Sequence, residues 1–293
     1  DFHVNTISII DDLFGADKRY FYEFFEKIDQ NGLDFHLIIP GGLSIAIFDE
    51  AMIDILIARG LKAVYFPLES GSQYVQNQII KKRVNLEKAT RLIHYTKKKG
   101  VFVGINIILG FPGETKEMMH ETYLFIKGLP VDSVAFFSAY PYPGTEMTQT
   151  LLDQGVLTED RLLEIWDSTT QGFKRRPYDT EEISGQELAD LIYDYNTEIN
   201  FFSNDNIRSG NFAFLLPKLD KIIHRYPFHI VALACRAYCY ANLGRYDEAS
   251  IDADTIKKLI LQNGESRKLF DRYEHRITSF MKEANLRMDW RSS

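Results

Sequence analysis

The chain has 293 residues, of which 45% are hydrophobic and 26% charged, an ordinary globular composition with enough apolar residues for a sizeable core in one or two domains. A formal net charge of −7 argues against nucleic acid as a partner, because that partner needs a basic surface. No apolar run reaches the ~18 residues of a membrane span, and the N-terminus has no signal-peptide pattern. Two cysteines are too few for a disulfide scaffold. We therefore predict a cytoplasmic protein without a membrane contact.

The first half of the chain alternates short β-rich runs with segments of helical periodicity. The expected strands are residues 2–10, 35–39, 62–68, 101–109 and 132–139. The expected helices between them are residues 18–31, 49–59, 86–99 and 116–127. Parallel strands need such helical crossovers, so the pattern predicts an α/β fold with five strands in one curved parallel sheet and an exposed edge at residues 2–10. The chain enters this pattern at Asp1 without an initiator Met, which indicates an internal start within a longer protein.

Polar or glycine-rich clusters follow several of these strands, at the ends where barrels and open α/β sheets build their sites. They are Asp11-Asp12, Glu69-Ser70-Gly71-Ser72-Gln73, Gly110-Phe111-Pro112-Gly113-Glu114-Thr115 and Tyr140-Pro141-Tyr142-Pro143-Gly144-Thr145. Each cluster alone is typical of a turn. Their order and spacing together indicate one site at the carboxyl edge of the sheet.

From about residue 196 the chain is predicted to be all helical. Gly210-Asn211-Phe212 recurs 34 residues later as Gly244-Arg245-Tyr246, and 34 residues is the period of tetratricopeptide repeats. Further matches to that repeat's usual positions are Pro227, Tyr240, Leu243 and Ala249. Leu261 departs from the pattern, since the repeat usually has Pro there. Stacked helices of this kind present a concave surface, so a protein or peptide contact is expected.

Together, the clusters after the strands resemble the radical S-adenosylmethionine (SAM) superfamily, in the branch that often carries a cobalamin-binding domain upstream and includes the anaerobic Mg-protoporphyrin ester cyclases. The resemblance covers about residues 2–147. It implies an incomplete radical-SAM-type (β/α) partial TIM barrel over residues 1–147. A linking segment, residues 148–195, is expected to pack on the barrel through Trp166 and Phe173, and residues 196–293 form the tetratricopeptide-like helical region.

The resemblance also implies which residues hold S-adenosylmethionine. Asp11 or Asp12 falls where the amino group is held, and Glu69 with Ser70 falls where the ribose hydroxyls bind. Lys82 or Arg83 falls where the carboxylate is met, and residues 107–109, with Ile108 and Leu109, flank the adenine. These residue types suit those groups, because carboxylates pair with cations and diols while flat apolar surface suits a purine. The alternatives are a helix cap or turn for the two aspartates, a structural hydrogen bond for Glu69, and a solvated helix start for Lys81 to Arg83.

The chain departs from the family in its cysteines. The superfamily ligates a [4Fe–4S] cluster through three cysteines in one loop, and ligation needs thiolates. This chain has only Cys235 and Cys239, which lie in the helical region and are expected to be core residues. The cluster loop is therefore expected upstream of Asp1, and this chain is expected to ligate no metal.

The sequence thus predicts a fragment of a radical SAM enzyme, of Fe–S oxidoreductase, cyclase or methyltransferase type, that acts on an organic substrate. The resemblance implies that the parent protein holds S-adenosylmethionine and the cluster, and the branch it resembles often holds a cobalamin as well. The alternative is a non-catalytic degenerate barrel whose helical repeats bind a protein partner. An upstream C-x₃-C-x₂-C motif in the natural protein would favour the enzyme. A barrel aldolase is disfavoured, because its best lysine, Lys62, lies at the start of a strand rather than the end.

Overall fold

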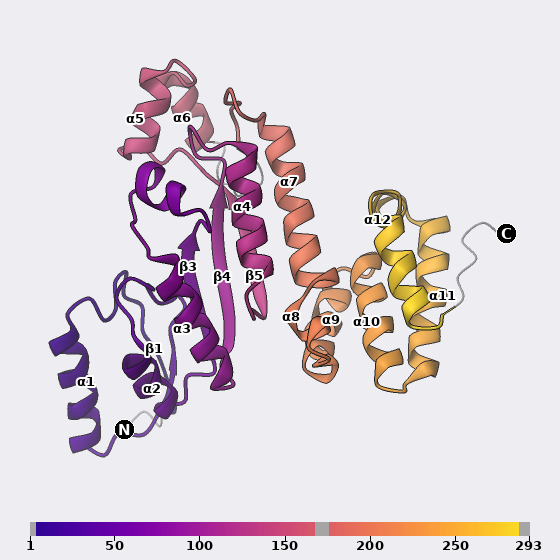
Figure 1. The fold of residues 1–293 in the computed structure, drawn as a ribbon, viewed down its shortest axis with the longest axis horizontal. Helices are drawn as coiled ribbons and strands as arrows, with labels where there is room; N and C mark the ends of the chain where they lie inside the picture. Colours follow the sequence, from indigo (N-terminus) through magenta and orange to yellow (C-terminus); the bar gives the residue numbers. More distant parts are fainter. Residues whose placement is uncertain (1–3, 168–175, 287–293) are drawn as a thin grey trace. The chain divides into compact units, whose positions relative to one another are not determined.

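A computed structural model describes residues 4–167 and 176–286 (Figure 1). The chain forms two compact units that divide between Asn196 and Thr197. All described strands lie in the first unit, and the described part of the second is entirely helical. Within the described residues, no helix combines the length and the apolar character needed to cross a membrane.

The first unit begins with strands that alternate with helices, as the sequence predicts. The strands are β1 (Thr6–Ser8), β2 (His36–Ile38), β3 (Ala63–Glu69), β4 (Phe102–Leu109) and β5 (Ser133–Ser138). The helices between them are α1 (Lys18–Gln30), α2 (Glu50–Ala58), α3 (Leu86–Lys98) and α4 (Lys116–Lys127), with a π-helical turn, η1 (Val75–Ile79), before α3. Every strand pair is parallel. The predicted α/β class of this region is therefore confirmed.

The prediction of one continuous sheet is wrong, because the strands form a β1-β2 pair and a separate β3-β4-β5 sheet. The break follows β2, where Pro40 lacks an N–H and Gly42 adopts a φ of +79°. The segment after the break contacts β3 through the Leu43 N–H, which donates to the Tyr65 carbonyl at 2.8 Å. Gly42 packs so closely there that a Cβ would lie 2.5 Å from the same oxygen. β1 is also shorter than expected, and residues 2 and 3 of the predicted strand lie outside the described residues.

The β3-β4-β5 sheet has one covered face and one open face. Alternate side chains of β4, namely Val103, Ile105, Ile107 and Leu109, are fully buried, as are Phe66 and Leu68 of β3. Tyr65 and Phe137 on the opposite face remain 38% and 52% exposed. The period of two in a strand puts these residues on opposite faces, so the apolar core lies on one side of the sheet only.

The segment after β5 contains α5 (Glu146–Asp153), α6 (Glu159–Asp167) and α7 (Gly185–Thr197). Trp166 of α6 donates its indole N–H to the Pro141 carbonyl at 3.1 Å. Near the end of α7, the side-chain amide of Asn196 both accepts from and donates to the backbone of Phe136 in β5. That amide occupies the edge of β5 as a neighbouring strand would. Phe173, the second predicted packing residue, lies outside the described residues.

The second unit consists of helices joined by short turns, as predicted for the region after residue 196. They are η3 (Glu198–Phe202), α8 (Asp205–Arg208), α9 (Phe212–Arg225), α10 (Ile230–Asn242), α11 (Tyr246–Gln262) and α12 (Gly264–Glu283). Gly210 and Gly244, 34 residues apart, precede α9 and α11 with φ of +74° and +75°. The recurring triplet therefore marks the same kind of turn twice, and its assignment to the tetratricopeptide family stays a prediction.

Candidate functional site

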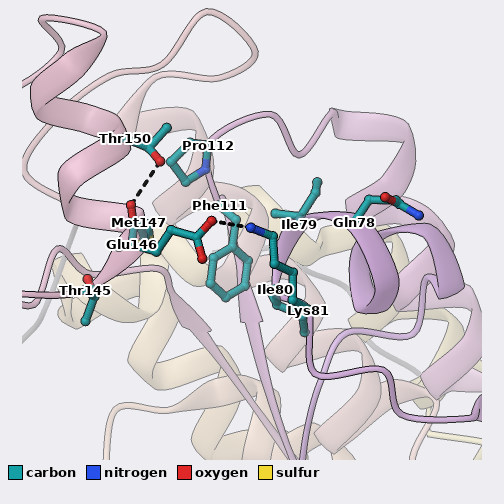
Figure 2. A pocket seen from close by; sticks show the side chains of 10 residues that line it. All are labelled: Gln78, Ile79, Ile80, Lys81, Phe111, Pro112, Thr145, Glu146, Met147 and Thr150. Atoms are coloured by element: carbon teal, nitrogen blue, oxygen red, sulfur yellow. Dashed lines mark hydrogen bonds and ion pairs between the residues drawn. The ribbon is translucent and has the colours of Figure 1, made fainter.

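Three loops after β3, β4 and β5 surround a cavity of about 410 Å³ (Figure 2). Its lining residues are Gln78, Ile79, Ile80, Lys81, Phe111, Pro112, Thr145, Glu146, Met147 and Thr150. They come from the three loops that follow these strands and from the first turns of α5. Three of the four loops predicted to form one site thus meet at one edge of the sheet, without the Asp11-Asp12 loop, and the residues predicted to hold S-adenosylmethionine do not line this cavity.

Glu69 and Lys82 are brought together at the carboxyl end of β3. Lys82 Nζ lies 2.8 Å from Glu69 Oε1 and also donates to the Pro67 carbonyl at 3.0 Å. Glu69 has a φ of +69°, and the same loop holds Lys81 and Arg83 at +54° and +53°. Left-handed backbone at non-glycine residues is strained and concentrates at functional sites. The structure therefore joins two of the predicted residues in one charged pair, on a strained loop.

Ser70 is turned away from this pair and has protein partners. Its hydroxyl is fully buried, lies 3.0 Å from Thr122 Oγ1 of α4, and accepts from the Ser72 N–H at 3.1 Å. Gln76 donates to the Ser70 carbonyl at 2.7 Å. The bonds to Thr122 and Ser72 satisfy the hydroxyl inside the protein, so its geometry suits support of the loop better than contact with a ribose.

Ile108 and Leu109 point to opposite faces of β4, because successive strand residues alternate. Ile108 is partly buried on the open face, whereas Leu109 is fully buried in the core. Of the two predicted adenine-flanking side chains, only that of Ile108 lies on the open face.

Asp11 and Asp12 are exposed in the loop after β1. Asp11 Oδ1 accepts from the Leu13 N–H at 2.8 Å, so Asp11 stabilises a turn. The cap of α1 is Asp17, which accepts from the Tyr20 N–H at 3.0 Å, so the helix-cap alternative for Asp11 and Asp12 is wrong. The two aspartates follow a strand of the smaller sheet, and no described contact joins them to Glu69 or Lys82.

Two charged residues that the sequence reasoning missed hold the loop after β4. Glu114 Oε2 accepts from the N–H groups of Gly110 at 2.7 Å and Phe111 at 3.1 Å. Arg176 donates to the Gly110 carbonyl at 2.9 Å and to the carbonyls of Tyr178 and Ile183. The carboxyl group of Glu114 and the guanidinium of Arg176 thus fix both sides of the chain at Gly110. The position of Glu114 directly before Thr115, the N-cap of α4, was a usable signal, whereas nothing near Arg176 in the sequence indicated its role.

Both groups are buried away from water. Glu114 is fully buried and Arg176 is 1% exposed. Burial raises the pKa of Glu114 from 4.5 to about 7, although the two backbone N–H bonds and the charge of Arg176 oppose the rise. The loop that forms one wall of the cavity is therefore held by a carboxyl group that titrates near neutral pH.

The cysteines of the chain do not fit an iron–sulfur cluster. Cys235 and Cys239 are buried on α10 in the second unit, as expected for core residues, and burial raises the pKa of both thiols. A neutral buried thiol is a poor metal ligand. Among the described residues, no group of three or more His, Cys, Asp and Glu side chains is arranged to hold a metal ion.

Comparison with known proteins identifies the first part of the chain. Residues 2–126 match the family model described as the radical SAM superfamily. These residues belong to that superfamily. Membership implies S-adenosylmethionine and a [4Fe–4S] cluster as the family's cofactors, and it agrees with the parallel α/β architecture of the first unit.

Relatives of the radical SAM domain include methyltransferases and a cyclase. The chain is 29% identical over 206 residues to cytidylyl-2-hydroxyethylphosphonate methyltransferase of Streptomyces wedmorensis, covering 68% of this chain and 38% of that protein. It is 28% identical over 157 residues to an uncharacterized methyltransferase of Pyrococcus horikoshii, covering 54% and 34%. It is 24% identical over 137 residues to the anaerobic magnesium-protoporphyrin IX monomethyl ester cyclase of Rubrivivax gelatinosus, covering 47% and 24%. The chain thus spans little more than a third of the first two relatives.

Proposed function

We propose that this chain is the part of a radical SAM methyltransferase that binds S-adenosylmethionine and an organic substrate. The observation that carries the proposal is the Glu69–Lys82 pair, which lies at a strand's carboxyl end within the segment that matches the superfamily. Methyl transfer is favoured over cyclisation because the similarity to the Streptomyces methyltransferase extends over 206 residues, more than the 137 shared with the cyclase. Cytoplasmic location and a cobalamin in the parent stay predictions.

The roles proposed for the residues follow from their charges and places. The ion pair uses Oε1 of Glu69, so Oε2 can accept hydrogen bonds from the ribose hydroxyls. Lys82 offers a positive charge to the carboxylate of the methionine moiety. Ile108 gives apolar surface on the open face of β4, and Asp11 or Asp12 offers a carboxylate to the amino group. The cysteines that ligate the cluster would come from residues outside the printed sequence.

Replacing Glu69 with glutamine should weaken the binding of S-adenosylhomocysteine by about tenfold or more. We expect the wild-type chain to bind S-adenosylhomocysteine with a Kd in the sub-millimolar to millimolar range. Without a cluster the metal–ligand bonds to the ligand are missing, and each loss of about 1.4 kcal/mol of binding free energy weakens the affinity tenfold. The variant loses the charged acceptor for two ribose hydroxyls. Titration calorimetry or ligand-observed NMR measures the change. Glu87→Gln, an exposed glutamate of α3, is the control and should bind as the wild type does; equal affinity in the Glu69 variant would remove Glu69 from the site.

The chain alone should take up no [4Fe–4S] cluster on anaerobic reconstitution. Its two cysteines are buried and lie in the helical unit, whereas a cluster needs three thiolates close together. Iron and sulfide assays with the cluster's absorption spectrum give the result. Uptake of about four irons per chain that survives substitution of Cys235 and Cys239 by serine would contradict this expectation.

A second candidate is a non-catalytic scaffold whose helical unit binds a protein or peptide. The observation that favours it is that both cysteines are buried in the helical unit, while the described residues beside the sheet include no group arranged to hold a metal ion. The two candidates differ in the adenosylmethionine cleft, which a scaffold has no need to keep. Absence of S-adenosylhomocysteine binding at several millimolar would support the scaffold, and loss of binding in the Glu69→Gln variant would support the methyltransferase.

A further inference from the structure

The cavity after β3, β4 and β5 is lined by apolar side chains, by the polar Gln78, Thr145 and Thr150, and by two opposite charges. Phe111, Met147 and Ile79 are partly buried and give it apolar and aromatic surface. Lys81 and Glu146 form an ion pair across it, and Figure 2 shows their side chains pointing toward each other. A volume of about 410 Å³ lies in the range of small-molecule sites.

The backbone on the β3 side of this cavity is irregular in two ways. Ile79 ends the π-helical turn η1, and Lys81 follows it in the left-handed region at φ +54°. π-turns and left-handed non-glycine residues both cost conformational energy and recur at functional sites. Together they present the Lys81 side chain to Glu146 of α5 rather than to its own loop.

The ion pair defines which ligand charges the cavity accepts. Both side chains are largely exposed, at 53% and 74%, so the pair opens at little cost. A ligand with one charge would pair with one side chain and leave the other without its partner. A ligand that carries both charges exchanges the protein's ion pair for two new ones, and complementary charge of this kind sets specificity.

We propose that this cavity binds a zwitterionic small molecule with a large apolar side chain, of the α-amino-acid class. Its carboxylate lies on Lys81, its ammonium on Glu146, and its apolar body on Phe111 and Met147. Naming this ligand the organic substrate rests on the proposed function, whereas the binding itself does not. None of the residues expected to hold S-adenosylmethionine lines the cavity, so the two ligands occupy separate sites.

Three probes that share a phenyl ring and differ in charge test the charge requirement on the full chain: L-phenylalanine, phenylacetate and phenethylamine. Saturation-transfer NMR titrations measure their binding. L-Phenylalanine should bind about fivefold or more tightly than either singly charged probe. Lys81→Met should abolish its advantage over phenethylamine, and Glu146→Gln its advantage over phenylacetate. Lys116→Met, which breaks an exposed ion pair with Glu187 outside the cavity, is the matched control and should change nothing.

Three results would overturn the proposal. They are equal binding of the three probes, no binding of L-phenylalanine, and Lys81 and Glu146 variants that behave as the wild type. 5′-Methylthioadenosine, which keeps the adenosine of S-adenosylhomocysteine but has no amino-acid group, should not displace L-phenylalanine, and displacement would overturn the separation of the two sites. The Glu69→Gln titration tests the proposed function independently. Loss of S-adenosylhomocysteine binding with L-phenylalanine binding intact therefore affects only the adenosylmethionine cleft.

Discussion

Replacing Arg236 with methionine should lower the free energy of unfolding of the helical unit by about 3–5 kcal/mol. Arg236 of α10 donates twice to Asp252 of α11, at 2.8 and 2.6 Å, and once to Asp220 of α9 at 2.8 Å. Asp252 is only 2% exposed. The variant keeps a side chain of similar length but leaves the Asp252 carboxylate buried without its cation. Urea denaturation followed by circular dichroism measures the loss.

The two aspartates provide matched controls for this arginine. Asp220 is half-exposed, so Asp220→Asn should cost less than about 1 kcal/mol. Adding Asp252→Asn to Arg236→Met should recover much of the lost stability, because it removes the unpaired buried charge. A single Arg236→Met variant as stable as the wild type, or a double variant no better than the single, would show that the pair does not hold these helices together.

The helices and strands from β1 to β5 could be predicted because each has a strong local signal. The 3.6-residue period and Asn85 as N-cap mark α3, and an unbroken apolar run marks β4. The split into two sheets could not be predicted. It depends on how closely Gly42 packs against the Tyr65 carbonyl, a tertiary contact that no local pattern contains.

Only those parts of the candidate site that directly follow a predicted strand could be predicted from the sequence. Glu69 and Lys82 follow a strand that was placed correctly, and they do meet. Strand parity should have excluded Leu109 from the open face once Ile108 was assigned to it. The cavity was missed because Glu146 belongs to α5, a helix that the sequence analysis treated as part of the linking segment. The partner of Glu146, Lys81, has a left-handed backbone conformation, which the pattern of side chains in the sequence does not reveal.

Replacing Glu114 with glutamine should remove a pH dependence from the stability of the first unit. The pKa of Glu114 rises from 4.5 in an exposed glutamate to about 7 in the folded protein. Between these values the folded state binds a proton that the unfolded state has released. The stabilisation is therefore complete below pH 4.5 and is lost as the pH rises through 7, a change of about 3 kcal/mol at 1.36 kcal/mol per pKa unit.

Wild type and variant should thus unfold at similar urea concentrations near pH 4.5, and the variant should be the more stable by about 3 kcal/mol at pH 7.5 or above. Glutamine can still accept from the N–H groups of Gly110 and Phe111, so the loop is kept. The control is Glu117→Gln, at an exposed glutamate whose pKa is lowered by its own backbone N–H and Thr115. A lowered pKa stabilises the folded state above pH 4.5 and loses this effect only at lower pH, so the stability difference between this variant and the wild type should stay constant from pH 4.5 to 7.5. Parallel stability curves for wild type and Glu114→Gln between pH 4.5 and 7.5 would show that Glu114 is already ionised in the folded protein. The wall of the cavity would then be held by a buried carboxylate in the field of Arg176.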